Sequence, residues 1–204
     1  MYLRLFVKTC IETKHHSIVK MMFTRRFFSH FHKASVKPLI VYTDGSFMQN
    51  LLIGGMGLYF PNNEMSSLSI KYVNPIEPTS QRCELLAVKY ALVIHHTWFS
   101  NKELHIYTDS KYAVDSLNLY SSVWQKNGWL KQCGLPVKNQ DLLKPMVSYL
   151  STCAIKPQLN YIPAHSKTLD RHSVNNNIAD AYARRGLIMS DKVLPACFVD
   201  ALEL

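Results

Sequence analysis

Four acidic residues in this chain stand where the side chains of separate elements could meet. Asp44 and Asp109 each end an apolar run closed by Tyr-Thr-Asp, and turn or helix-start residues follow both. Glu84 and Asp180 each lie in a stretch with helical character. Carboxylates brought together repel one another unless protons or cations neutralise them. Hard carboxylate oxygens favour Mg²⁺ or Mn²⁺, so the four residues predict a divalent-metal site.

Such a site has a definite chemistry. Mg²⁺ keeps part of its water shell and takes its remaining ligands from substrate phosphate. Two ions about 3.5–4 Å apart can activate a water and stabilise the departing oxygen of an in-line phosphoryl displacement. The four acids therefore point to a nuclease.

Each acid also has a plain structural interpretation. Asp44, before Gly-Ser, fits a turn, and Asp109 fits the start of a helix. Asp180 is placed to pair with Arg184 at i+4. Glu84, within an apolar run, needs a partner such as Arg82 or a metal. Their joint arrangement favours the functional interpretation.

Hydrophobic periodicity predicts the elements that must position these acids. Five strands are expected, at residues 38–43, 57–60, 67–73, 103–108 and 158–163. The segments 45–55 and 61–64 read as hairpin loops, and Gly186 as the residue that closes the last helix. Helices are expected from the cap at Thr79-Ser80 to about Thr97, from Ser110, and from Asn176 to Gly186. This order predicts a mixed α/β sheet with helices packed on it.

Strand geometry then suggests how the first two acids approach each other. Side chains alternate faces along a strand, so Asp44 shares a face with Tyr42, and Asp109 with Tyr107. If the two strands are neighbours, both carboxylates lie at the same rim of the sheet.

Composition divides the chain into a leader and one domain. With 204 residues and 48% hydrophobic content, it can bury a full core. The formal charge is +9, but residues 1–37 hold eight Lys and Arg against one acid, Glu12. That leader resembles a mitochondrial presequence; the alternative is a basic tail on a nuclear or cytoplasmic protein. We expect a leader at 1–37, a catalytic domain at 38–187 and an extension at 188–204.

Two further features narrow the class. The five cysteines are scattered, without a C-x-x-C pair, which indicates a reducing compartment and neither a disulfide framework nor a zinc site. No run approaches the roughly 20 apolar residues of a spanning helix, so no membrane partner is expected.

Six ordered stretches resemble the catalytic domain of type 1 ribonuclease H. The resemblance implies the ribonuclease H-like fold, a five-stranded mixed sheet with helices on both sides. It also implies a monomeric, Mg²⁺-dependent endoribonuclease, with Mn²⁺ as an alternative, that cuts the RNA strand of RNA–DNA hybrids. The stretches are Tyr42-Thr43-Asp44-Gly45-Ser46, Thr79-Ser80-Gln81-Arg82-Cys83-Glu84, Tyr107-Thr108-Asp109-Ser110, Trp124-Gln125-Lys126-Asn127-Gly128-Trp129, Pro136-Val137-Lys138-Asn139 and Asn176-Asn177-Ile178-Ala179-Asp180.

The same resemblance assigns roles to single residues. Asp44, Glu84, Asp109 and Asp180 would be the metal ligands, and His165 a loop histidine that assists proton traffic and product release. Segment 124–139 would be a basic protrusion that binds DNA through stacking and phosphate attraction. The implied substrate-binding residues are Gly45, Ser46, Thr79, Ser80, Gln81, Trp124, Lys126, Trp129, Asn139 and Asn176.

The chain departs from the family pattern in three places. Ser80 stands where Asn is frequent, Glu77 stands where a phosphate-pocket Arg is common, and the interval from His165 to Asp180 is longer than usual. Nothing between the leader and Pro38 resembles the hybrid-binding domain of many eukaryotic relatives, so we expect low processivity. The alternatives are a non-catalytic hybrid-binding or RNA-binding scaffold and a DNA nuclease of the same fold.

Overall fold

The computed structural model describes residues 37–74, 76–164 and 170–188. The predicted leader and C-terminal extension therefore lie outside the described residues, apart from residues 37 and 188. The strands are β1 (Leu39–Met48), β2 (Ile53–Tyr59), β3 (Leu68–Lys71), β4 (Leu104–Thr108) and β5 (Gln158–Tyr161). The helices are α2 (Ser80–Trp98), α3 (Lys111–Asp115), the π-helical turn η1 (Ser116–Tyr120), α4 (Ser121–Lys126), α5 (Gln140–Thr152) and α6 (Arg171–Ile188).

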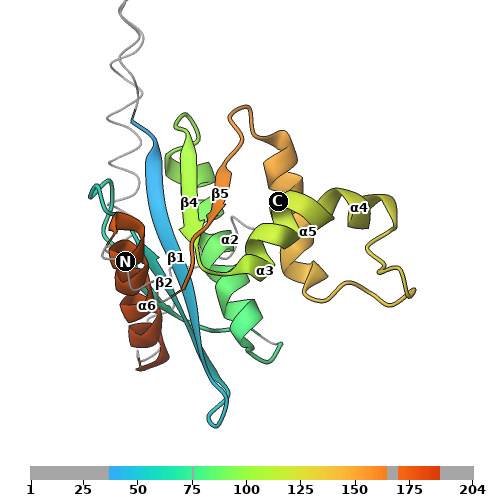
Figure 1. The fold of residues 1–204 in the computed structure, drawn as a ribbon, viewed down its shortest axis with the longest axis horizontal. Helices are drawn as coiled ribbons and strands as arrows, with labels where there is room; N and C mark the ends of the chain where they lie inside the picture. Colours follow the sequence, from blue (N-terminus) through green and yellow to red (C-terminus); the bar gives the residue numbers. More distant parts are fainter. Residues whose placement is uncertain (1–36, 75, 165–169, 189–204) are drawn as a thin grey trace, which may run out of the picture. The chain divides into compact units, whose positions relative to one another are not determined.

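The five strands form one mixed sheet in the order β3-β2-β1-β4-β5 (Figure 1). β1, β2 and β3 make an antiparallel meander. β4 pairs with β1 in parallel, and β5 pairs with β4 in parallel. The predicted mixed α/β sheet is confirmed. Its parallel pairs need crossover connections, which the helices between the strands supply.

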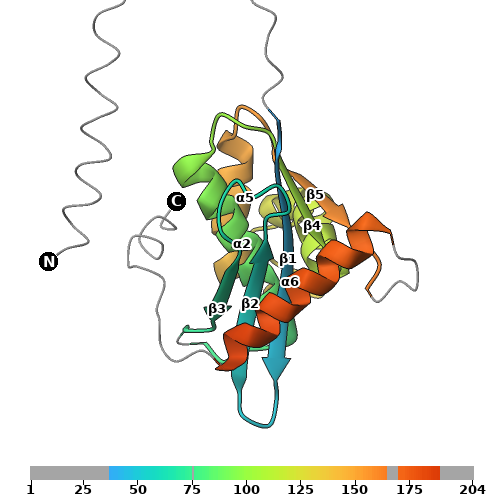
Figure 2. The same cartoon turned by 90° about the vertical axis from the view of Figure 1, so that its left-hand side faces the viewer.

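Helices cover both faces of this sheet, as Figure 2 shows for α2 and α6. The α2 face holds the main hydrophobic core, built from side chains such as Leu39, Val41 and Ile106 against the apolar side of α2. The α6 face holds a much smaller cluster around Tyr42, Ile162 and Ala179. The α2 face therefore holds its helix through a large apolar core, whereas the α6 face has far fewer buried apolar side chains.

The predicted hairpin at residues 45–55 is present, but its loop is much shorter than expected. Residues 45–55 form the end of β1, a short turn and the start of β2 rather than a long loop. β1 continues beyond its parallel pairing with β4, which ends at Tyr42–Tyr107, and is then paired with β2 alone. The glycines that suggested a loop lie in strands because helices pack directly against their backbones.

Gly186 does not close the last helix, which runs on to Ile188. A Cβ at Gly186 would lie 2.5 Å from the carbonyl oxygen of Ile70 and 3.1 Å from Cα of Gly55. The residue is glycine because the helix and the sheet approach closely there, not because the backbone turns. Among the described helices, none is long and apolar enough to span a membrane.

Candidate metal and nucleic-acid site

Asp44 lies in the middle of β1, on the face that α6 covers. Its register partner on β2 is Gly57, where a Cβ would overlap the carbonyl oxygen of Ala179 in α6. This strand residue therefore sits directly beneath the helix that carries Asp180. The Asp44 side chain is only 9% exposed, and its Oδ1 accepts a 2.7 Å hydrogen bond from the Gly45 N–H.

Gly45 brings the second acid to the site. On this residue a Cβ would overlap the backbone of Cys83 and Glu84, so only glycine lets the start of α2 touch β1. Glu84 is thereby set beside Asp44. Its carboxylate accepts from Ser110 Oγ at 2.5 Å and from Ser80 Oγ at 3.2 Å.

The remaining two acids are held by residues of α6. Asp109 follows the end of β4, and its Oδ2 accepts a 3.0 Å hydrogen bond from Nδ2 of Asn176. Asp180 forms an ion pair with Arg184, with 2.7 Å between Oδ2 and Nη2. Asn176 is 4% exposed, and its Oδ1 has no hydrogen-bond partner among the described residues.

Electrostatics link the four acids, named here the carboxylate cluster. The pKa of Asp44 is raised to about 8, chiefly by burial and also by the charges of Asp109, Asp180 and Glu84, while the hydrogen bond from Gly45 acts in the opposite direction. Burial also raises the pKa of Glu84, while bonds from Ser110 and Ser80 act in the opposite direction. Within residues 37–74, 76–164 and 170–188, no three His, Cys, Asp or Glu side chains are placed to hold a metal ion.

The structural interpretations of the acids fare differently. Asp44 is not a turn residue, because it lies within β1. Arg82 is not the partner of Glu84, since its guanidinium pairs with Asp141. The i+4 pairing of Asp180 with Arg184 is present. Asp109 lies just before Ser110, whose side chain caps α3.

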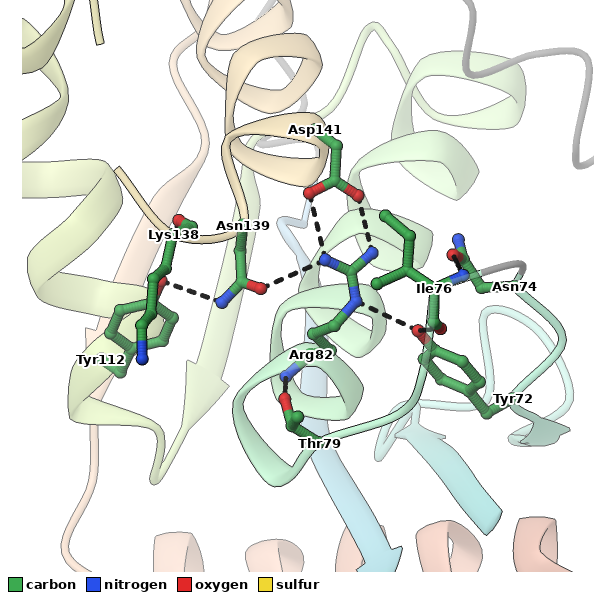
Figure 3. A network of polar contacts seen from close by, with 9 residues as sticks. All are labelled: Tyr72, Asn74, Ile76, Thr79, Arg82, Tyr112, Lys138, Asn139 and Asp141. Carbon is green, nitrogen blue, oxygen red and sulfur yellow. Dashed lines mark hydrogen bonds and ion pairs between the residues drawn. The ribbon is translucent and has the colours of Figure 1, made fainter. Parts of the chain in front are cut away.

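A second polar group lies close by and is drawn in Figure 3. Arg82 is 4% exposed and donates to Asp141 through both terminal nitrogens, at 3.0 and 2.6 Å. It also donates to Asn139 Oδ1 and to the Tyr72 hydroxyl, both at 3.1 Å. Asn139 Nδ2 in turn donates to the Tyr112 hydroxyl at 3.1 Å. We name these five residues the Arg82 network.

The predicted phosphate contacts Asn139 and Thr79 have protein partners in this structure. Asn139 has a left-handed backbone, with φ of 57°, and directs both ends of its amide to protein partners. Thr79 caps α2 by accepting from the Arg82 N–H at 3.2 Å. Ser80 and Gln81 follow on the exposed first turn of α2, and Ser46 is half-buried in β1.

The predicted protrusion consists of α4 and the loop that leads to α5 (Figure 1). Trp124 stacks on Tyr120 at 5.6 Å between ring centroids and lies 6.3 Å from Trp129. Both tryptophans are half-buried and pack against the main core. Lys126 is exposed, whereas Lys144 lies over the Trp129 ring at 5.7 Å. The two tryptophans therefore have a packing role in the structure.

The sequence predicted a functional role for His165 and gave none to His172. His165 lies outside the described residues, so its role stays a prediction. His172, which received no role, hydrogen-bonds to the Tyr42 hydroxyl at 3.0 Å on the face that carries Asp44. The signal that could have revealed it is the repeated Tyr-Thr-Asp, which places two tyrosines side by side.

Similar proteins point in one direction. Residues 36–188 match the RNase H family model. A protein of Schizosaccharomyces pombe named "Ribonuclease H" is 31% identical over 150 residues, which is 72% of this chain and 52% of that protein. One from Rickettsia bellii with the same name is 34% identical over 121 residues, 58% of this chain and 74% of that one. A mimivirus "Probable ribonuclease H" is 32% identical over 132 residues, 64% of this chain and 56% of that protein.

Solved structures share the fold. The solution structure of the PFV RNase H domain has a TM-score of 0.61 at 24% identity, covering 73% of this chain and 93% of that one. LC11-RNase H1, solved with an RNA/DNA hybrid, has a TM-score of 0.51 at 17% identity, covering 73% and 96%. The chain spans only about half the length of the mimivirus and yeast relatives. Since the family model matches most of the chain, this protein belongs to the RNase H family.

Proposed function

We propose that this chain is a metal-dependent endoribonuclease that hydrolyses the RNA strand of RNA–DNA hybrids, leaving 5′-phosphate and 3′-hydroxyl ends. Family membership and the names of its relatives support this activity. The observation that carries it is the burial of Asp44 beside three other carboxylates, which raises its pKa to about 8. Burial and neighbouring carboxylates disfavour the ionised form of Asp44, and a bound cation would neutralise this repulsion.

The donor set fits Mg²⁺ or Mn²⁺. Asp44, Glu84, Asp109 and Asp180 offer only carboxylate oxygens, which hard divalent ions prefer. Each carboxylate accepts a hydrogen bond or ion pair from a neighbouring donor, and within the described part of the chain only Asp180 has a salt bridge. Two ions held there would activate a water and stabilise the leaving oxygen of the phosphodiester.

Other residues of the chain prepare the site for this role. Ser110 and Asn176 hold the carboxylates of Glu84 and Asp109, so these oxygens are oriented before a substrate arrives. A fixed orientation of charged groups is what makes such a site effective in stabilising a transition state.

Recognition of the hybrid would use both strands. Gly45, Ser80, Gln81 and Glu84 are the proposed readers of ribose 2′-hydroxyls, which tell RNA from DNA. The exposed side chains of Lys126, Lys131 and Lys138 would attract phosphates without regard to sequence. Asn139 and Thr79 are the proposed phosphate contacts, and Asn139 would reach a phosphate with an amide that the Arg82 network already orients.

A cleavage assay tests this function. The full chain should cut a labelled RNA–DNA hybrid in Mg²⁺, stop in EDTA, and leave double-stranded RNA and double-stranded DNA intact. Binding to the hybrid without cleavage would instead indicate a scaffold, and cutting of DNA alone would indicate a DNA nuclease of the same fold.

Cellular location and assembly are also proposals. The basic composition of residues 1–37 supports import into mitochondria, with the nucleus or cytoplasm as the alternative. A fluorescent fusion with and without these residues would show whether they direct the protein. Light scattering after gel filtration would test the expected monomer.

A further inference from the structure

Three aromatic side chains form a contact between α6 and the sheet that the proposed chemistry does not use. Tyr42 and Tyr107 are register partners on β1 and β4, and their rings stack with 5.0 Å between centroids and 18° between planes. The His172 ring lies 4.6 Å from Tyr107 and 6.0 Å from Tyr42. Its Nδ1 is 3.0 Å from the Tyr42 hydroxyl oxygen. The repeated Tyr-Thr-Asp motif thus builds a platform for one residue of α6.

The two ends of α6 are held to the sheet in different ways. Towards its C-terminus, Ala179, Ala183 and Gly186 are buried, and the helix backbone lies directly on strand glycines. In the first two turns, only the amides Asn175 and Asn176 are buried. No apolar side chain is fully buried there, so specific contacts must hold this end in place.

His172 supplies such a contact one turn before Asn176 and two turns before Asp180. Asn176 holds Asp109 through its Nδ2, and Asp180 contributes to the electrostatic field at Asp44. Residues four apart lie on the same side of a helix. A shift of the helix start would therefore carry Asn176 and Asp180 with it.

We propose that His172 is a positioning residue that docks the start of α6 on the Tyr42–Tyr107 platform and so sets Asn176 and Asp180 within the carboxylate cluster. The proposal rests on the proposed function only where it concerns metal binding; the docking itself is a property of the fold.

The geometry argues against a direct chemical role for His172. Eight residues separate it from Asp180, which is about 12 Å along a helix that rises 1.5 Å per residue. The Nδ1 atom of His172 instead faces the Tyr42 hydroxyl at 3.0 Å, and the ring lies against the Tyr107 ring. The imidazole is thus engaged with the platform and not directed at the acids.

Three variants separate the contributions. His172→Ala removes both the ring contact and the hydrogen bond, His172→Asn keeps a polar group near the position of Nδ1, and Tyr42→Phe removes only the hydroxyl. His96→Ala is the matched control, because His96 is also exposed and also contacts a tyrosine ring, 5.2 Å from Tyr149, but lies on α2.

Hydrogen exchange and calorimetry give readouts that do not depend on activity. In the metal-free full chain, His172→Ala should speed amide exchange across residues 171–180 by up to about tenfold and leave 183–188 unchanged, as expected for loss of one hydrogen bond. Calorimetric titration with Mg²⁺ alone should show weaker binding by a similar factor. His172→Asn and Tyr42→Phe should give smaller changes of the same kind, and His96→Ala none.

Each outcome bears on one statement. Unchanged exchange and unchanged Mg²⁺ affinity in His172→Ala would overturn the positioning role. Unchanged exchange with an altered pH profile of kcat would also overturn it, in favour of proton transfer. If the unaltered chain fails to cut hybrids, the proposed function is wrong, but the exchange data still decide whether His172 docks the helix. Where His172→Ala does not fold, the two milder variants carry the test.

Discussion

The carboxylate cluster and the Arg82 network have members two residues apart on α2, Glu84 and Arg82. The buried charge is paired in the network and lacks a counter-charge around Asp44 in the cluster. In the network, a buried guanidinium has a carboxylate, an amide and a hydroxyl as partners, and the bonds to Asp141 and Tyr72 raise the pKa of Arg82 although burial lowers it. In the cluster, burial and the charges of Asp109, Asp180 and Glu84 raise the pKa of Asp44 to about 8. A buried charge that has all its partners is costly to disrupt, whereas buried carboxylates without a counter-charge indicate a binding site for a cation.

The same contrast appears in what holds each group. The Arg82 network joins the start of α2 to the start of α5 and to Tyr112 of α3, so it fixes the base of the protrusion relative to Glu84 (Figure 3). The acids of the cluster are held mainly by single hydrogen bonds from Gly45, Ser110 and Asn176. The many bonds of the Arg82 network hold segments of the fold together. The cluster's oxygens have few donors, so a metal ion can replace a donor as their partner.

The largest expected effect would break the cluster chemically. Asp44→Asn should lower hybrid cleavage by about 10³-fold or more, because metal-borne charge stabilisation is worth several kcal/mol. Hybrid binding in a filter or anisotropy assay should persist, since one negative charge near phosphate is removed. Asp115→Asn, which breaks the surface pair with Lys111, is the control and should stay active. Full activity of Asp44→Asn would refute the metal assignment.

The next effect concerns stability against pH. Because the pKa of Asp44 is about 8 in the folded protein, against an ordinary 3.8, the folded state binds more protons between these values. The contribution of Asp44 to stability therefore falls as pH rises from about 4 to 8. Metal-free Asp44→Asn should be more stable than the parent by about 2–5 kcal/mol at pH 8 and nearly equal to it at pH 4.

Urea unfolding of both proteins in EDTA at several pH values would measure this difference. Added Mg²⁺ at pH 8 should stabilise the parent and not the variant. A constant difference across the pH range would mean that the burial of Asp44 is not what sets its proton affinity.

The opposite sign is expected in the Arg82 network. Asp141→Ala leaves the buried guanidinium without its carboxylate and should lower the free energy of unfolding by about 2–3 kcal/mol, somewhat less than for a fully buried pair. Asp115→Ala, at a surface i,i+4 pair, should lower it by only about 0.3–0.5 kcal/mol. Equal losses in the two variants, measured by urea unfolding, would remove the contrast between the two regions.

The smallest expected effect tests what the ion pair between Arg184 and Asp180 contributes. Its partner Arg184 is 64% exposed, so Arg184→Gln should lower stability by only about 0.3–0.5 kcal/mol. Release of the Asp180 carboxylate should also lower the Mg²⁺ concentration needed for half-maximal binding in calorimetry. Arg185→Gln on the same turn is the control. Weaker metal binding in Arg184→Gln would show that the arginine supports the site.

Much of the fold could be read from local pattern. The helix capped by Thr79 is α2 as observed, and the strand before Ser110 is β4. These elements have strong period and clear caps, and they bury the main core. A hairpin between the first two strands was expected, but the full length of β1, β2 and α6 could not be read, since their glycines serve close packing against partners that are distant in sequence.

The candidate site divides in the same way. The four acids were recognisable by type and setting, because a repeated Tyr-Thr-Asp after apolar residues and an acid in an apolar helix are unusual locally, although Asp44 lies within β1 and not at its end. Arg82 was expected near Glu84 but pairs with Asp141, which lies 59 residues away in sequence. The contact of His172 depends on two strands becoming neighbours, so the repeated Tyr-Thr-Asp motif indicates it only once that pairing is known.

The sequence by itself determined the chemistry of this protein: which oxygens it offers, the alternation that places Tyr42 with Asp44, and the helix caps. Tertiary structure alone decided which of those groups meet. Parallel pairing of β1 with β4 made the tyrosines a platform, and the missing Cβ of Gly45 let Glu84 approach Asp44. The physical reason is that side-chain type is a local property, whereas burial and charge interaction depend on packing between segments far apart in the chain.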